Sequence, residues 1–154
     1  MADCIREAAD QLHELLMEGL GRMVAEEKVP AVPLPAFRVE IPADKSHGDF
    51  AANVAMVSAK AFRMAPRKIA ELILESISLH GTIFDRAEIA GPGFLNFFLK
   101  PEWFSKVVET VLTEKDTYGK TQTGAGKRAL VEFVSANPTG PMHMGNARGG
   151  AIGD

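Results

Sequence analysis

The sequence predicts an α+β domain in which antiparallel strands are covered by helices, followed by the first strand of a second domain. Three observations support this. Over residues 1–115, apolar spacings typical of helices and strands follow one another as helix, strand, two helices, two strands, helix. A polar, glycine-rich segment with almost nothing to bury comes next. Residues 129–134 then form a nearly continuous apolar run, which is typical of a strand buried on both faces of a parallel sheet.

Composition indicates a globular protein. The chain has 154 residues, 46% hydrophobic and 24% charged, which argues against a disordered tail or a disulfide scaffold. No apolar run approaches the roughly 18 residues of a membrane-spanning helix, and we expect neither a signal peptide nor a membrane partner. A single cysteine, Cys4, excludes a disulfide framework and a cysteine metal site, which favours the cytoplasm. The net charge of −3 means that any RNA contact must come from a local basic surface.

The first half of the chain contains the longest predicted helix. It begins near Ile5 and keeps helical apolar spacing as far as Val24. We expect it to end at the proline-rich segment 29–35, whose prolines remove backbone donors and hold the chain extended. Residues 37–41 then alternate as a strand does.

Two shorter helices and two strands are expected after this strand. A polar loop leads into a helix of small residues at 51–62, for which Asp49 is the expected N-cap. Pro66 predicts the start of the next helix, which covers residues 67–79. Strands at 83–90 and 94–99 are joined by a Gly/Pro turn. A last helix begins near Pro101 and carries a wide apolar stripe.

These elements predict a domain at residues 1–116, a linker at 117–127 and the start of a second domain at 128–154. A parallel strand needs a crossover of about a dozen residues before its partner, yet the sequence stops inside the first helix that would follow the strand at 129–134. We therefore expect the second domain to be truncated, and residues 117–154 to be weakly ordered.

The residues from 131 to 149 carry the most informative motif. They combine a buried strand, a tight Pro/Gly turn and a glycine-containing helix start. Free N–H groups and the helix dipole at such a point bind phosphate. His143 could donate to phosphate oxygens there, and Glu132 could pair with a guanidinium group. Residue types alone favour a generic Gly/Pro turn into a helix over a phosphate site, so the ligand stays open.

This segment resembles the first signature of class I aminoacyl-tRNA synthetases in the form typical of arginyl-tRNA synthetases. It reads Glu-Phe-Val-Ser-Ala-Asn-Pro-Thr-Gly-Pro, followed by His-x-Gly-x and Ala-Arg-Gly. Residues 46–53 and 88–96 resemble the amino-terminal appended domain of the same family. The resemblance spans nearly the whole chain, with residues 1–36 the least diagnostic. It implies that the full-length parent is an arginine-tRNA ligase, which activates arginine with ATP and transfers it to tRNA(Arg), and that residues 128–154 open its Rossmann-like catalytic domain.

The resemblance also implies roles for individual residues. His143 and Gly145 match the first and third positions of the four-residue ATP signature, so His143 would contact the phosphates. Asn146 stands where a second histidine is usual, and it keeps a donor but loses the possible positive charge. The implied ATP-binding residues are His143, Gly145 and Asn146, with His143 and Asn146 catalytic. The implied arginine-binding residues are Glu132, Ser135, Asn137 and His143.

The resemblance implies ATP as a substrate with its magnesium ion, and no other metal. The family's lysine-bearing second signature, the remaining sheet strands and the anticodon-binding domain all lie beyond residue 154 in the full enzyme. We therefore expect this fragment to be inactive and to hold no cofactor.

The appended domain of the family contacts the outer corner of the tRNA, at the D-loop. The residues that could make this contact are Arg38, Lys45, His47, Lys60, Arg63, Arg67 and Lys68. Alternatively, these residues form a solvated basic surface that contacts no RNA, and His47 serves only as a hydrogen-bonding residue of the turn. Phe37 and Phe50 could stack on a base, or could be core residues. The competing hypothesis for the whole chain is a non-enzymatic RNA-binding or structural interaction domain, and we expect no DNA partner.

The sequence argues against a metal site and against a phosphate loop. The four histidines are too scattered for metal ligation. The sequence at 124–128 has Arg128 where a phosphate loop requires serine or threonine.

Overall fold

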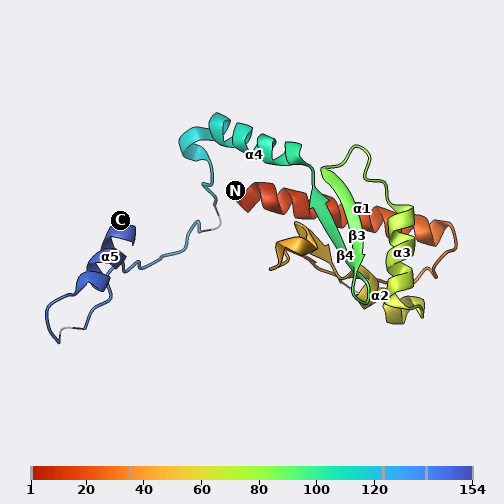
Figure 1. Cartoon of the computed structure of the whole chain (residues 1–154), viewed down its shortest axis with the longest axis horizontal. Coiled ribbons are helices and arrows are strands. Elements are labelled where there is room, and N and C mark those ends of the chain that lie inside the picture. The colour runs from red at the N-terminus through yellow and green to blue at the C-terminus, as the bar shows by residue number, and fades with distance from the viewer. Residues whose placement is uncertain (1, 35, 123, 138, 154) are drawn as a thin grey trace. The chain divides into compact units, whose positions relative to one another are not determined.

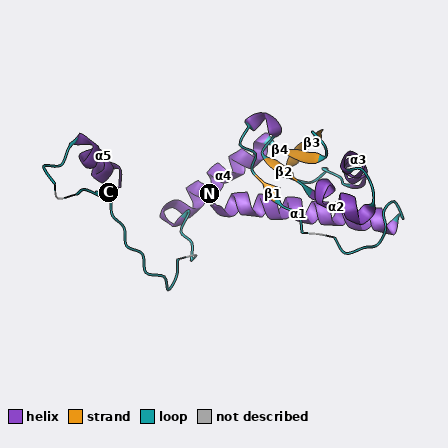
Figure 2. Ribbon diagram, turned by 90° about the horizontal axis from the view of Figure 1, so that it is seen from below, coloured by secondary structure: helices purple, strands orange, loops and turns teal. Residues whose placement is uncertain are grey.

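The computed structural model describes residues 2–34, 36–122, 124–137 and 139–153. Pro35, Thr123, Pro138 and Asp154, which belong to segments discussed above, lie outside the described residues. The chain divides into two compact units, Met1–Gly119 and Lys120–Asp154, which are described separately. The elements of the first unit, shown in Figures 1 and 2, are α1 (Ala2–Ala25), β1 (Val39–Glu40), η1 (Lys45–His47), β2 (Phe50–Ala52), α2 (Val54–Phe62), α3 (Pro66–Ser76), β3 (Phe84–Ala90), β4 (Phe94–Leu99), α4 (Pro101–Glu114) and η2 (Lys115–Thr117).

The first unit is built on a four-stranded antiparallel sheet, which confirms the predicted α+β fold. The strands lie in the order β1-β2-β4-β3. β4 is central and pairs with β2, where Phe50 lies opposite Phe97, and with β3, where Ile89 lies opposite Leu95. β1 completes the edge through two residue pairs with β2.

One face of this sheet packs against helices α1, α2 and α3. Leucines of α1 at helical spacing, together with Ile69 and Ile73 of α3, are fully buried against it. From the strands, Phe84 and Phe97 meet edge to face with ring centroids 5.6 Å apart. The apolar face of α1 therefore covers the sheet, as its spacing predicts.

The region around Asp49 differs from the sequence prediction. Asp49 is not the N-cap of a helix, and the predicted helix 51–62 begins only at Val54 because Phe50–Ala52 forms a strand. The Asp49 carboxylate instead accepts a 2.8 Å hydrogen bond from the Leu99 backbone N–H. Pairing with β4, far along the chain, outweighs the local helical tendency of this segment. Phe50 is a core residue with 3% exposure.

Other boundaries are shorter than predicted. The segment 37–41 contributes only the two-residue strand β1, and Phe37 stacks on His13 with a centroid separation of 4.4 Å. The helix predicted at 67–79 ends at Ser76, because Ile77 adopts an extended conformation. The strands predicted at 83–90 and 94–99 and the helix predicted near Pro101 are confirmed.

The second unit contains one helix, α5 (Met144–Gly153), among its described residues. The strand predicted at 129–134 is not formed, and Leu130, Val131 and Phe133 are exposed. A strand of a parallel sheet needs neighbouring strands to satisfy its backbone, and none is present in the described part of this unit. Phe133 and Val134 instead lie beside glycines of α5.

None of the helices in the described part of the chain combines the length and the apolar content that a membrane crossing requires.

Candidate functional site

The segment at 143–146 forms a capping box at the start of α5. His143 precedes the helix, and its Nδ1 accepts a 3.1 Å hydrogen bond from the Gly145 backbone N–H. In return, the Asn146 side-chain oxygen accepts a 3.1 Å hydrogen bond from the His143 backbone N–H. This reciprocal pairing satisfies two donors at the start of the helix, and it fixes both side chains relative to the helix axis.

The capping box also fixes the tautomer of His143. Because Nδ1 accepts a hydrogen bond, the neutral ring carries its proton on Nε2. Nε2 can therefore donate to an anion. The Asn146 side-chain oxygen acts here as an acceptor for the turn, and its amide nitrogen remains a possible donor.

A hollow of about 300 Å³ lies beside this turn. Four of the residues implied for ATP or arginine binding line it: Ser135, Asn137, His143 and Asn146. Glu132 and Gly145 are not among the residues that line it. In the described residues no group of three His, Cys, Asp or Glu side chains is placed to hold a metal ion.

A basic cluster in the first unit lies where α2 meets α3. Lys60 is in the last turn of α2, and Arg63 caps that helix with a left-handed backbone at φ 53°. Arg67 and Lys68 are in the first turn of α3, where both approach Glu71, at 3.9 and 3.5 Å. Among the described residues no carboxylate lies within salt-bridge distance of Lys60 or Arg63. These two residues therefore carry the least neutralised charge of the cluster.

The second group of predicted RNA contacts is held by the loop before β2. The Asp44 carboxylate accepts hydrogen bonds from the backbone N–H and the hydroxyl of Ser46, at 2.9 and 2.8 Å. These two bonds hold the pKa of Asp44 below its usual value. They shape η1, which leaves Lys45 and His47 exposed.

Gly48 and Asp49 attach this loop to the sheet. The Asp49 backbone N–H donates to the Phe97 carbonyl at 2.9 Å. Gly48 has a φ of 86°, and a side chain at that position would meet the Phe97 carbonyl. Only glycine therefore allows the loop to lie so close to β4. Arg38, the remaining predicted contact, lies just before β1 and approaches Glu40 at 3.9 Å.

Sequence reasoning missed the sheet face that faces away from the core. Strand register places Arg86 and Glu88 of β3 on this outer face with Phe94, Asn96 and Phe98 of β4. Phe94 is 39% exposed, whereas Asn96 is 5% exposed. The Arg86 guanidinium carbon lies 3.6 Å from the centre of the Phe98 ring. The alternation along 94–99 could have revealed this face, because Leu95, Phe97 and Leu99 point to the core.

The two basic groups border opposite ends of the outer face. At one end the loop carrying Lys45 and His47 approaches the Phe98 ring through Gly48. At the other end Gly93, next to Phe94, lies directly against Pro66 at the start of α3. The outer face, with the exposed Phe94 and the nearly buried Asn96, lies between these two close approaches.

Comparison with solved structures defines the fold. The arginyl-tRNA synthetase of Plasmodium falciparum matches with a TM-score of 0.53 and 17% identity, over 67% of this chain and 18% of that one. At this identity the likeness shows the fold alone.

Comparison with known sequences defines the family. A family model described as the arginyl tRNA synthetase N terminal domain matches residues 4–99. The arginine–tRNA ligase of Acetivibrio thermocellus is 45% identical over all 154 residues, and that of Desulforamulus reducens is 46% identical over the same length. The arginine–tRNA ligase of Desulfitobacterium hafniense is 52% identical over 79% of the chain. The chain belongs to the arginyl-tRNA synthetase N-terminal domain family.

The chain is much shorter than these relatives. It spans 27% of the Acetivibrio thermocellus ligase, 28% of the Desulforamulus reducens ligase and 22% of the Desulfitobacterium hafniense ligase.

Proposed function

We propose that this chain acts as the amino-terminal part of an arginine–tRNA ligase, in which the first unit binds tRNA(Arg) and the second carries part of the ATP and arginine site. The observation that carries this proposal is the identity of about 45% to arginine–tRNA ligases along the whole chain, including the segment around His143. The boundaries 1–116, 117–127 and 128–154, and a cytoplasmic location, belong to the same proposal.

For tRNA binding, the support comes from the surface of the first unit. Lys60 and Arg63 have no carboxylate partner in the described structure, so phosphate binding would not have to break an ion pair. Exposed cations that contact phosphates release counterions, and this drives association. Phe94, exposed on the outer face between the basic groups, offers a ring on which an unstacked base can pack. The proposed contacts are Arg38, Lys45, His47, Lys60, Arg63, Arg67 and Lys68, with Phe94 added from the structure.

For ATP and arginine binding, the support comes from the hollow beside α5. His143 presents an Nε2 donor at the start of a helix, where the dipole favours a phosphate group. Ser135 and Asn137 line the same hollow and offer polar groups to arginine, and Glu132 remains a proposed partner for the guanidinium or ammonium group. ATP would enter with magnesium as a substrate, and the residues named here hold no metal themselves.

We expect the 154-residue chain alone to be inactive. Residues 129–134 form no strand, and none of the described residues of the second unit is buried. An exposed hollow cannot hold substrates in fixed geometry or exclude water, and catalysis needs both. Incubation with ATP, magnesium and arginine should therefore give no arginyl-adenylate, and its formation would contradict this part of the proposal.

Titration with tRNA(Arg) at two salt concentrations tests the binding surface. Double charge reversal, Lys60→Glu with Arg63→Glu, should weaken binding and reduce the slope of log affinity against log salt by about 2, because two phosphate contacts are lost. The matched control reverses Arg6 and Lys106, which are exposed cations on α1 and α4. If both pairs have the same effect, the basic cluster is only a solvated surface and the domain acts as a structural brace.

A further inference from the structure

Helix α4 carries an apolar stripe that the first unit does not cover. Phe104, Val108, Val111 and Leu112 follow one another at spacings of four, three and one residues, so they lie on one side of the helix. All four are exposed, with Val108 at 58% and Leu112 at 68%. A run of large apolar side chains on one helix face usually marks an interaction site.

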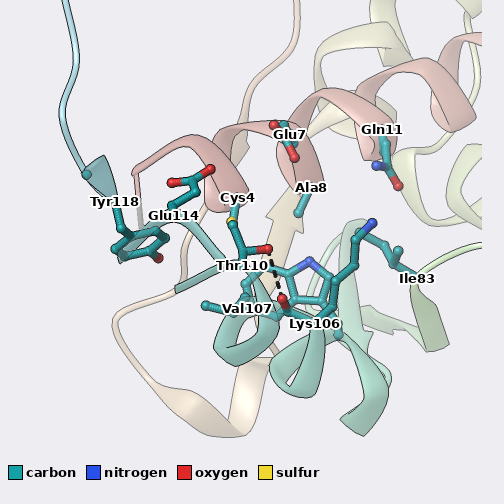
Figure 3. Close-up of a pocket in the computed structure, with 12 residues that line it drawn as sticks. Cys4, Glu7, Ala8, Gln11, Ile83, Lys106, Val107, Thr110, Glu114 and Tyr118 are labelled. Atoms are coloured by element: carbon teal, nitrogen blue, oxygen red, sulfur yellow. Dashed lines mark hydrogen bonds between the residues drawn. The ribbon is translucent and has the colours of Figure 1, made fainter. Parts of the chain in front are cut away.

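A different side of α4 accounts for its contacts within the first unit. Trp103, Val107 and Thr110 line a hollow of about 300 Å³ with residues of the first turns of α1. Figure 3 shows Val107 and Thr110 of α4 across this hollow from Ala8 of α1. α4 therefore meets α1 through one side, and none of its residues is buried. The apolar stripe takes no part in the core of the domain.

The position of α4 in the family indicates what covers the stripe. The match to the family's N-terminal domain ends at residue 99, and α4 begins at Pro101. The helix thus lies outside the domain that the family model defines. The relatives nevertheless match α4 and continue well past it, since this chain accounts for only 27% of the Acetivibrio thermocellus ligase. In these relatives α4 is therefore followed by a large body of additional protein.

We infer that the apolar stripe of α4 is an interdomain interface, occupied by the part of an arginine–tRNA ligase that follows the matched region in the longer relatives. Docking of this stripe would fix the orientation of the tRNA-binding unit relative to the catalytic domain. The inference rests on the proposed function and adds to it the surface through which the two parts are held together.

The test compares one substitution in two contexts. Leu112→Asp places a charge on the stripe, and Thr113→Asp is the control at the next position, which is exposed and faces away from the stripe. Both are introduced into this chain and into a chimera in which it is continued by the rest of the Acetivibrio thermocellus ligase. In this chain alone, where the proposed occupant is missing, the two substitutions should change the unfolding midpoint by the same amount. In the chimera Leu112→Asp should lower it by at least about 2 °C relative to Thr113→Asp.

If the chimera does not fold, a second measurement replaces it. Adding the separately purified remainder of that ligase to this chain should slow amide hydrogen exchange over residues 101–114, and Leu112→Asp should abolish this protection. Equal effects of the two substitutions in a folded chimera would overturn the inference. With no folded chimera, absence of added protection would overturn it. The inference would also be overturned if this chain forms a dimer and Leu112→Asp abolishes that dimer, because the occupant of the stripe would then be a second copy.

Titration of the same variants with tRNA(Arg) tests the proposed function separately, since the stripe lies outside the basic cluster.

Discussion

The Asp49 carboxylate joins two parts of the chain that are 50 residues apart in sequence. It accepts a hydrogen bond from the partly buried Leu99 N–H at 2.8 Å, and its own backbone N–H donates to Phe97. Asp49→Ala leaves the Leu99 donor without its partner, which should lower the free energy of unfolding by about 1–3 kcal/mol. Urea denaturation followed by circular dichroism measures this.

Asp85→Ala is the control for this substitution. Asp85 is exposed, and its ion pair with Arg86 at 3.7 Å is on the surface, so its loss should change the unfolding free energy by about 0.5 kcal/mol or less. If the two substitutions lower the free energy of unfolding by the same amount, the hydrogen bond from the Leu99 N–H does not stabilise the loop.

Asp44 gives a prediction that depends on pH. Hydrogen bonds from the backbone N–H and the hydroxyl of Ser46 lower its pKa in the folded protein. A carboxyl group with a lowered folded-state pKa stabilises the protein above its unfolded pKa, and the effect disappears as the pH falls through the folded value. The side-chain carboxyl carbon of Asp44, followed by NMR, should report a pKa below the ordinary aspartate value of 3.8. Ser46→Ala should raise that pKa towards the ordinary aspartate value, and no change would show that the hydroxyl is not involved.

At the scale of single elements, the turn between β3 and β4 decides how closely the sheet packs on α3. Gly93 has a φ of 146°, and a Cβ there would fall 2.9 Å from the backbone carbon of Pro66. Gly81 also has a positive φ, 78°, but has open space around it. Gly81→Ala should therefore cost about 1–2 kcal/mol from backbone strain alone, and Gly93→Ala distinctly more, because backbone atoms must move apart.

Unfolding free energies of the two glycine variants separate the two effects. If Gly93→Ala costs no more than Gly81→Ala, the close approach to α3 is absent in solution.

The elements that sequence could predict are those specified by local patterns. The Gly/Pro turn between two strand-like segments identified β3 and β4, and Pro101 with its apolar spacing identified α4. The strand β2 was missed because its three residues gain stability only by pairing with β4, which lies far along the chain. Asp49 was misassigned for the same reason, since a capping aspartate and one that bonds to a distant strand look alike in sequence.

The candidate sites show the same division. The capping box at His143 and Asn146 is local, and the motif that contains it was found from the sequence. The outer face of the sheet was missed because it exists only after Phe98 and Arg86 are brought side by side by strand pairing. The approach of Glu71 to Arg67 and Lys68 distinguishes members of the basic cluster that the sequence treated as equivalent.

At the scale of the whole molecule, the stability of the described fold resides in the first unit. Every buried hydrophobic residue of the described core lies between Ala8 and Leu99, and none of the described residues after 119 is buried. Removing residues 120–154 therefore takes away little buried apolar surface, and burial of such surface is the main stabilising contribution. A chain that ends at Gly119 should unfold cooperatively, with a midpoint within about 2 °C of the longer chain, as measured by thermal circular dichroism.

Limited trypsin digestion examines the same division without changing the sequence. Lys120, Lys127 and Arg128 lie in an exposed segment without helix or strand, and proteases cut such segments first. Cleavage should therefore begin at these three residues and leave a product that includes α1 to α4. The Lys and Arg residues of α1 to α3 should resist until that product unfolds, because cutting them requires the helices to open. Protection of Lys127 and Arg128 at the rate seen for α1 would show that the second unit packs into a stable structure, and it would contradict the expected independence of the first unit.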